Sequence, residues 1–332
     1  MKDEILSRIQ KKFPLVPKPF EHIANELGLE ESEVLAILQK EKDAGIIRQT
    51  SAIFDTKRLG YKSSLVAFKI APQKIDEAVT IINAHPGVSH NYERNHDFNI
   101  WFTMAVAPDS KLGLEKTIEI LAQKTQADDY IMLPTLKLFK INVKLNTTGK
   151  DEKKEKVKKV KHKEIELTPL HHQIIQKVQY DIDFVSEPFK KLIDELDISY
   201  DEFFTILQEL QESGVMRRFA SILNHRKAGF NANAMVVWDV DEQEGEAIGA
   251  KAAAFSAVSH CYLRPKYANW PYNLFTMVHG KTTEETNGII EEMAQEIEAK
   301  AHMPLYSSRE FKKVRIEYFT PAFQEWEEKN HG

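Results

Sequence analysis

The chain has a single cysteine, Cys261, which excludes an internal disulfide framework. It also has no Cys/His pair at the spacing of a zinc site. No run of about 18 consecutive apolar residues occurs, and segment 1–20 lacks the apolar centre of an export signal. These absences predict a protein that neither enters nor crosses a membrane, and we expect it in the reducing cytoplasm.

An excess of positive charge is also missing, since 45 Lys and Arg side chains stand against 50 Asp and Glu side chains. This balance is not typical of a protein that coats nucleic acid. The 332 residues, 42 % of them hydrophobic, are sufficient for buried cores and for two domains or two fused modules.

The most informative feature of the sequence is an internal repeat. Segment 19–61 recurs without gaps as segment 188–230. Further along, VSHNYER at 88–94 recurs as VSHCYLR at 258–264, and FTM at 102–104 recurs at 275–277. We conclude that the chain consists of two copies of one module, which are separated by a charged low-complexity linker at 147–166.

The spacing of apolar residues changes from helical to strand-like within each copy. In the first copy we predict helices at 21–27 and 32–44 with Gly28 as a C-cap between them, and then a two-strand wing around 47–54. A strand, a helix, two strands, a helix and a strand follow, at 64–70, 74–84, 88–94, 99–105, 111–123 and 137–145. The second copy repeats this order, with helices at 189–196 and 200–213 and its last strand at 307–318.

This order predicts an α+β fold in which a winged helix-turn-helix joined to a ferredoxin-like βαββαβ domain occurs twice. The expected domains are helix-turn-helix units at 1–62 and 167–231, ferredoxin-like domains at 63–146 and 232–332, and the linker at 147–166. Such a module resembles the leucine-responsive family of transcription regulators. A DNA-binding regulator is therefore the first hypothesis.

The expected recognition helices are unsuited to DNA, because a helix in the major groove needs cations and amides for phosphates and bases. The first, at 31–43, carries four acidic side chains against two lysines, and the second, at 200–212, carries four acidic side chains and no Lys or Arg. We expect no DNA binding.

Cations, imidazoles and aromatic rings gather instead at two places in each copy. Around the wings lie Arg48, Lys57 and Arg58 in the first copy, and Arg217, Arg218, His225, Arg226 and Lys227 in the second. On the central strands lie His90, Tyr92, Arg94 and His96 in the first copy, and His260, Tyr262, Arg264, Trp270, Tyr272 and His279 in the second. Strand alternation places each His-Tyr-Arg triplet on one face.

This combination suits a large, flat polyanion. Guanidinium groups hold carboxylates, aromatic faces pack on a ring system, and imidazole titrates near neutral pH and also ligates iron. We therefore expect a carboxylated tetrapyrrole as the ligand.

Two motifs carry a closer resemblance, HNYERNHDFNIWFT at 90–103 and SHCYLRP at 259–265 continuing through WPYNLFTMVHG at 270–280. They resemble the two different subunits of the siroheme decarboxylase family, here joined in one chain. The resemblance implies removal of CO2 from two acetate side chains of siroheme in haem or denitrifier-haem biosynthesis, without an added cofactor and with the iron belonging to the substrate.

The resemblance and the residue chemistry together assign roles. His260 and His90 are the expected proton donors, with His96 as a further candidate, and either His260 or His90 is a candidate axial ligand of the substrate iron. Residues expected to bind the substrate are Arg48, Tyr92, Arg94, Trp101, Arg217, Arg218, His225, Tyr262, Arg264, Trp270, Tyr272 and His279. The first copy has Gln49 where the second has Arg218, so we expect the second copy to form the main site, with two unequal sites left open.

Two other hypotheses stay open at this point: a ligand-sensing transcription regulator, and a haem or siroheme sensor or carrier without turnover. The two halves are expected to pair with each other as an internal pseudo-dimer, with a homo-oligomer also allowed.

Overall fold

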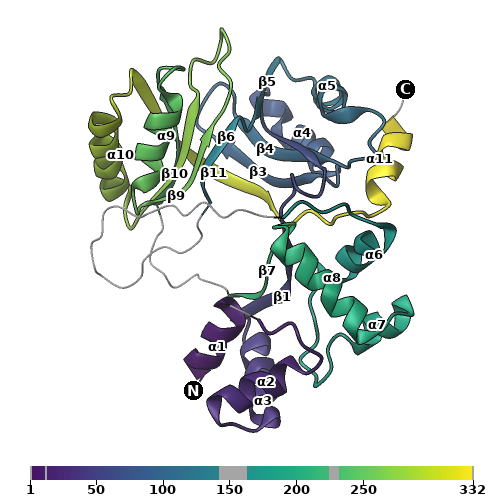
Figure 1. The fold of residues 1–332 in the computed structure, drawn as a ribbon. Coiled ribbons are helices and arrows are strands. Elements are labelled where there is room, and N and C mark those ends of the chain that lie inside the picture. The colour runs from purple at the N-terminus through teal and green to yellow at the C-terminus, as the bar shows by residue number, and fades with distance from the viewer. Residues whose placement is uncertain (1, 12, 142–162, 224–231, 331–332) are drawn as a thin grey trace.

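The computed structural model describes residues 2–11, 13–141, 163–223 and 232–330. Figure 1 shows two regions, a helical one around the N-terminus and an α/β one that holds the strands β2–β6 and β8–β11. The tandem α+β fold predicted from the repeat is confirmed. Residues 147–162 of the predicted linker lie outside the described residues, and so does His225.

The helical region contains three helices from each copy. These are α1 (Lys2–Lys11), α2 (Pro19–Leu27) and α3 (Glu31–Asp43), and α6 (Pro169–Val178), α7 (Lys190–Leu196) and α8 (Tyr200–Glu212). Gly28 ends α2 at φ 66°, a left-handed conformation that glycine adopts without strain, so the predicted C-cap is confirmed. Glu30 and Glu33 then form a capping box at the start of α3.

The predicted two-strand wing is wrong. Each copy contributes one long strand instead, β1 (Ile47–Phe54) and β7 (Met216–Leu223), and the two strands pair with each other antiparallel. The Thr50 and Ser221 hydroxyls meet at 2.6 Å across this pair. A single strand has unpaired backbone groups, and the copy related by the repeat supplies a matching partner.

The α/β region contains the strands and helices of both ferredoxin-like domains. The first copy gives β2 (Lys62–Lys69), α4 (Ile75–Asn83), preceded by a 3-10 turn at Pro72–Lys74, β3 (Val88–Arg94), β4 (Ile100–Val106), α5 (Gly113–Thr125), β5 (Asp129–Pro134) and β6 (Lys137–Ile141). The second gives β8 (Ala232–Asp239), α9 (Gly245–Ala254), β9 (Val258–Leu263), β10 (Leu274–Gly280), α10 (Thr283–Ile297) and β11 (Ala301–Lys313), followed by α11 (Ala322–Asn330).

The strands form one sheet in the order β5-β2-β4-β3-β11-β8-β10-β9-β6. The fourth strand of the first domain is β5, which the sequence analysis missed, whereas the strand predicted at 137–145 is β6 and pairs with β9 of the other copy. In the same way, the first half of β11 pairs with β8 and its second half pairs with β3. The edge strands β3 and β9 thus each take a partner from the opposite copy.

Helices α4 and α5 cover the outer face of one half of the sheet, and α9 and α10 cover the other (Figure 1). The inner faces of the two halves meet in a core that includes Trp101, Trp270 and Phe275. No helix among the described residues is long and apolar enough to span a membrane.

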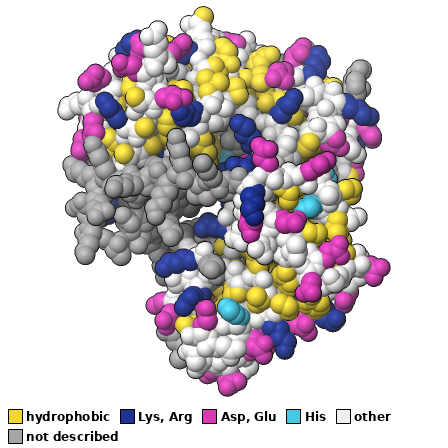
Figure 2. All heavy atoms as spheres, viewed as in Figure 1, with side chains coloured by type: hydrophobic (Ala, Val, Ile, Leu, Met, Phe, Trp, Pro, Cys, Tyr) yellow, Lys and Arg dark blue, Asp and Glu magenta, His cyan; other side chains and the backbone are white. Residues whose placement is uncertain are grey.

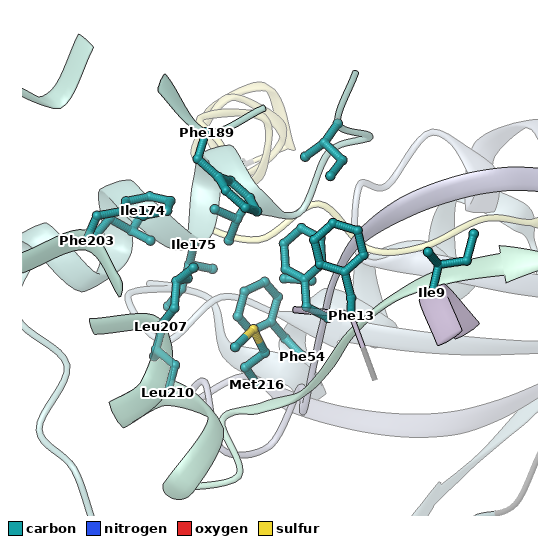
Figure 3. Close-up of a cluster of buried hydrophobic side chains, with 14 of the residues drawn as sticks. Ile9, Phe13, Phe54, Ile174, Ile175, Phe189, Phe203, Leu207, Leu210 and Met216 are labelled. Carbon is teal, nitrogen blue, oxygen red and sulfur yellow. The ribbon is translucent and has the colours of Figure 1, made fainter. Parts of the chain in front are cut away.

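A large cluster of apolar side chains joins the two helix-turn-helix units, and Figure 3 shows Phe13 within it. The Phe13 ring lies 5.8 Å from that of Phe20 in its own copy, and 6.5 and 5.1 Å from those of Phe189 and Phe219 in the other. In a regulator, the helices of such a unit contact DNA. Here the apolar faces of these helices pack in the core shared by the two copies.

We predict that Phe13→Ala lowers the free energy of unfolding by about 3–5 kcal/mol, because it leaves a cavity between the two copies. Phe13→Leu, which keeps most of the volume, should cost less than about 1.5 kcal/mol. Urea unfolding followed by circular dichroism measures both values. Equal losses for the two variants would contradict the role given to the ring.

Candidate tetrapyrrole-binding site

A cavity of about 720 Å³ lies between the inner faces of the two halves of the sheet. Both predicted triplets line this one cavity: His90, Tyr92 and Arg94 from β3, and His260 and Tyr262 from β9 with Arg264 directly after it. The strand register determines which face of the sheet each triplet occupies. Tyr92 lies opposite Trp101, and Tyr262 lies opposite Phe275. The two copies therefore contribute to a shared site. In Figure 2, Lys and Arg side chains lie around the hollow in the middle of the face shown.

The two triplet arginines reach across the boundary between the copies. Arg94 donates from Nη1 to the carbonyl of Leu305 in β11 at 2.7 Å. Arg264 donates from Nη1 to the carbonyl of Leu133 in β5. Each guanidinium also lies over the tyrosine of its own triplet, at 5.4 Å for Tyr92 and 4.8 Å for Tyr262. These bonds fix the arginines in place and hold the two halves of the sheet together.

Both arginines are buried, with 6 % of Arg94 and 8 % of Arg264 exposed. In each of them the Nε atom has no hydrogen-bond partner among the described residues. Burial lowers the pKa of each guanidinium to about 10, and no carboxylate of the described residues is among the groups that oppose that effect. A buried cation without an acidic partner is costly, so this cavity favours an anionic ligand.

In the second copy a chain of hydrogen bonds leads from the surface to His260. The Asn233 amide oxygen lies 2.7 Å from Nδ1 of His279, and Nε2 of His279 lies 2.6 Å from the Ser259 hydroxyl. That hydroxyl lies 2.7 Å from Nδ1 of His260. When the Asn233 oxygen accepts, each group along the chain donates toward Asn233, so His260 carries its proton on Nδ1 and leaves the Nε2 lone pair free.

The electrostatic surroundings of His260 keep it neutral. Burial, and then the positive fields of His279, His90 and Arg217, lower its pKa to about 4. A neutral imidazole with a free Nε2 lone pair is suited to ligate a metal ion or to accept a proton.

In the first copy the chain of hydrogen bonds links fewer residues. Nδ1 of His90 lies 3.0 Å from the Ser89 hydroxyl, which lies 2.7 Å from the hydroxyl of Thr103. Burial and Lys313 lower the pKa of His90, but Glu310 acts in the opposite direction. The two histidines are therefore chemically different although their triplets are repeats.

Several predicted residues lie behind the cavity wall and not on it. Trp101 and His279 line the cavity, whereas Trp270 and Tyr272 pack behind it with ring centroids 5.2 Å apart. His96 lies 5.4 Å from the Trp270 ring, and its Nδ1 accepts the backbone N–H of Phe98. His96 therefore supports the aromatic wall and is poorly placed to protonate a ligand.

The predicted wing residues Arg48, Arg217 and Arg218 do not line the cavity of the triplets. Arg48 lines a second cavity of about 590 Å³, which shares His90 and Lys313 with the first. Arg217 donates to Asp55 at 2.8 Å and lowers the pKa of that carboxyl against the effect of burial. Arg218 lies within electrostatic range of Arg315.

The cavity residues that the sequence analysis missed include Asn233, Ser259, Glu310 and Lys313. Ser259 and Ser89 precede the histidines in both copies, and this recurrence was an available signal. No comparable signal exists for Glu310 and Lys313, because only the pairing of β11 with the other copy brings them to the cavity. The described residues hold no group of three or more side chains that could bind a metal ion.

Family models place this fold among ligand-binding proteins related to transcription regulators. Residues 58–140 and 227–312 match the AsnC-like ligand binding domain. Residues 2–48 and 171–217 match the siroheme decarboxylase NirDL-like HTH domain.

Relatives that span the whole chain narrow the class to one family. A siroheme decarboxylase of Hydrogenobacter thermophilus is 43 % identical over 98 % of this chain and 96 % of its own. The crystal structure of the siroheme decarboxylase NirDL is 38 % identical, with a TM-score of 0.82 over 99 % of this chain and 98 % of its own. A second NirDL structure, in complex with an iron-uroporphyrin III analogue, has a TM-score of 0.81 at 37 % identity over the same shares of the two chains. The chain belongs to the siroheme decarboxylase family, as its motifs predicted.

We predict that the stability of the free protein falls as the pH is lowered from about 6.5 to 4. Burial lowers the pKa of His85 to about 3 and that of His260 to about 4. In this pH range the unfolded chain binds protons that the folded chain excludes, at a cost of up to about 1.4 kcal/mol per pH unit for each group.

Urea unfolding at several pH values measures this dependence. Carboxylates contribute to this pH dependence in the same way in every variant. The slope of the free energy of unfolding against pH should therefore be shallower in His85→Leu than in the wild type, by up to the equivalent of one proton. An identical slope would contradict the assignment to His85.

Proposed function

We propose that this chain removes CO2 from two acetate side chains of siroheme. The observation that carries this proposal is a pair of buried arginines without an acidic partner among the described residues. Both line one aromatic cavity together with two imidazoles. In each step the bond between the carboxylate and the acetate methylene breaks, CO2 leaves, and the electron pair stays on that carbon and spreads into the macrocycle. One proton then converts the methylene into a methyl group.

Arg94 and Arg264 act in binding and orientation. Their guanidinium groups, whose Nε atoms have no partner among the described residues, pair with peripheral carboxylates, and their bonds to Leu305 and Leu133 keep them fixed while they do so. Tyr92, Trp101 and Tyr262 form walls against which the ring packs. A ring that fills the cavity displaces water from the carboxylate that is to be lost.

We assign different roles to the two histidines. Burial and Lys313 lower the pKa of His90, the carboxylate of Glu310 partly offsets this effect, and His90 is the proposed proton donor. His260, held neutral with its Nε2 lone pair outside the hydrogen-bonded chain, is the proposed axial ligand of the substrate iron. This assignment gives both copies a role in one site, in place of the expectation that the second copy forms the main site.

No cofactor enters the proposed reaction, because the iron and the electron-accepting ring both belong to the substrate. We also infer that the protein works in the cytoplasm, and that the internal pairing of its two halves makes a second copy unnecessary for a complete cavity. A sensor or carrier would bind the same ligand, and turnover separates it from an enzyme.

The test is anaerobic incubation with siroheme, followed by mass spectrometry of the pigment. The wild type should remove two CO2 units. His90→Ala should bind siroheme with an unchanged absorption spectrum while turnover falls by about 10²–10⁴-fold, as expected for loss of a general acid. His260→Ala should shift the absorption bands of the bound ligand because it removes an iron ligand.

His96→Ala is the matched control, since its ring lies behind the wall. It should retain turnover within about threefold of the wild type, a change of less than 1 kcal/mol. Tight binding with unchanged pigment mass in the wild type would establish a carrier and exclude the enzyme. If His90→Ala shifted the absorption bands of the bound ligand and His260→Ala did not, the two histidine roles would be reversed.

The alternative of a DNA-binding regulator predicts a salt-dependent complex with DNA. We expect no retardation of duplex DNA in a gel at low salt, because α8 has no Lys or Arg and opens with Asp201 and Glu202. A regulator of the same fold serves as the positive control. A specific shift that disappears at higher salt would contradict this expectation.

A further inference from the structure

The second cavity, of about 590 Å³, lies where β1, the start of β3, the end of α6 and the segment after β11 meet. Three arginines gather there from separate elements: Arg48 on β1, Arg218 on β7, and Arg315 just after β11. Arg48 and Arg315 line the cavity, and Arg218 lies close enough to act electrostatically on Arg315. Like charges repel, so such a cluster needs an explanation.

Acidic side chains near the cluster are already engaged. Asp55 accepts two hydrogen bonds from Arg217, and Glu317 accepts the hydroxyl of Tyr180 at 2.9 Å. Arg48 and Arg218 form no ion pair within the described part of the chain. Among the described residues, Arg315 donates a side-chain hydrogen bond to the neutral Ser51 hydroxyl, at 3.1 Å. Burial, then Arg48 and Arg218, lower the pKa of Arg315. Among the described residues, Arg48, Arg315 and Lys313 therefore line the cavity with a single carboxylate, that of Glu317, and Arg218 adds positive charge nearby.

The second cavity adjoins the first, because His90 and Lys313 line both. A ligand whose ring lies between the triplets can extend side chains past His90 toward the arginines. Flexible carboxylate arms are better suited to pass between adjoining cavities than a second ring.

We propose that the second cavity is a subsite for the peripheral carboxylate arms of the tetrapyrrole, held by Arg48, Arg218 and Arg315. The subsite fixes the rotation of the ring in its plane and so decides which arms lie beside His90 and His260. This inference rests on the proposed function for the identity of the ring, and it adds a specificity-determining site that lies outside the shared cavity.

The test compares two ligands that differ in their arms. One is iron uroporphyrin III, which carries a carboxylate on every side chain, and the other is an iron mesoporphyrin with only two carboxylates. Arg48→Gln/Arg315→Gln should weaken binding of the first by about tenfold or more and of the second by less than about threefold, because each charged hydrogen bond contributes about tenfold or more in affinity. Fluorescence quenching or absorption titration measures the four dissociation constants.

Arg8→Gln is the matched control for loss of a positive charge, since Arg8 pairs with Glu26 on the helical region. It should leave both affinities unchanged. If the double variant does not fold, Arg48→Gln alone replaces it, because its side chain is exposed and its removal leaves the core intact. It should show the same ligand contrast, with binding of iron uroporphyrin III weakened about tenfold. Melting temperature is recorded for every variant.

Equal weakening for both porphyrins, or no weakening for either, would overturn the subsite. A free anion such as bicarbonate in this cavity would give the second result, since porphyrin affinity would not depend on the arms. Siroheme turnover is measured separately: KM should rise about tenfold in the double variant with kcat changed much less. Failure of the wild type to release CO2 would overturn the proposed function and leave the binding contrast to be judged by itself.

Discussion

The organisation of the molecule depends on the need of two sheet edges for a partner. In an isolated ferredoxin-like domain β3 and β9 would leave a row of unpaired backbone groups. Here each is covered by a strand from the opposite copy, β11 on β3 and β6 on β9. The exchange places the inner faces of the two halves against each other, and the cavity lies between them because the triplets stand on those two strands.

The arginines of the triplets then have two functions at once. Each donates to a backbone carbonyl of the other copy, which secures the closure of the sheet, and each lines the cavity with an Nε atom that has no hydrogen-bond partner among the described residues. The energy of burying such a cation is recovered only when an anion is present. A protein of this design is consequently more stable with its ligand bound than without it.

Sequence patterns predicted the parts of this arrangement that are local. Alternation placed His90, Tyr92 and Arg94 on one face, and Gly28 marked the end of a helix, because both properties depend only on neighbouring residues. The pairing of β1 with β7 and the crossing of β6 and β11 were not predictable, since a strand pattern does not state which edge the strand will join. Residues carried by those strands, such as Glu310 and Lys313, were missed for the same reason.

Duplication gave two similar halves, and small replacements made them different. The position of His279 on β10 corresponds to Val106 on β4, so the hydrogen-bonded chain to the surface exists behind His260 and ends at Thr103 behind His90. The helix-turn-helix units share a core with phenylalanine side chains from both copies, and α8 has none of the cations that a DNA-reading helix requires. These units therefore act as a structural support.

The strand exchange also sets the order in which the chain is able to fold. Arg94 and its carbonyl partner Leu305 are separated by 211 positions, and β3 has no partner for its outer edge until β11 has been synthesised. Contacts so distant along the chain require a costly loop closure and slow the search for the native state. During synthesis, the first half therefore emerges from the ribosome with an open edge and half a cavity, and the last strand to be made completes both.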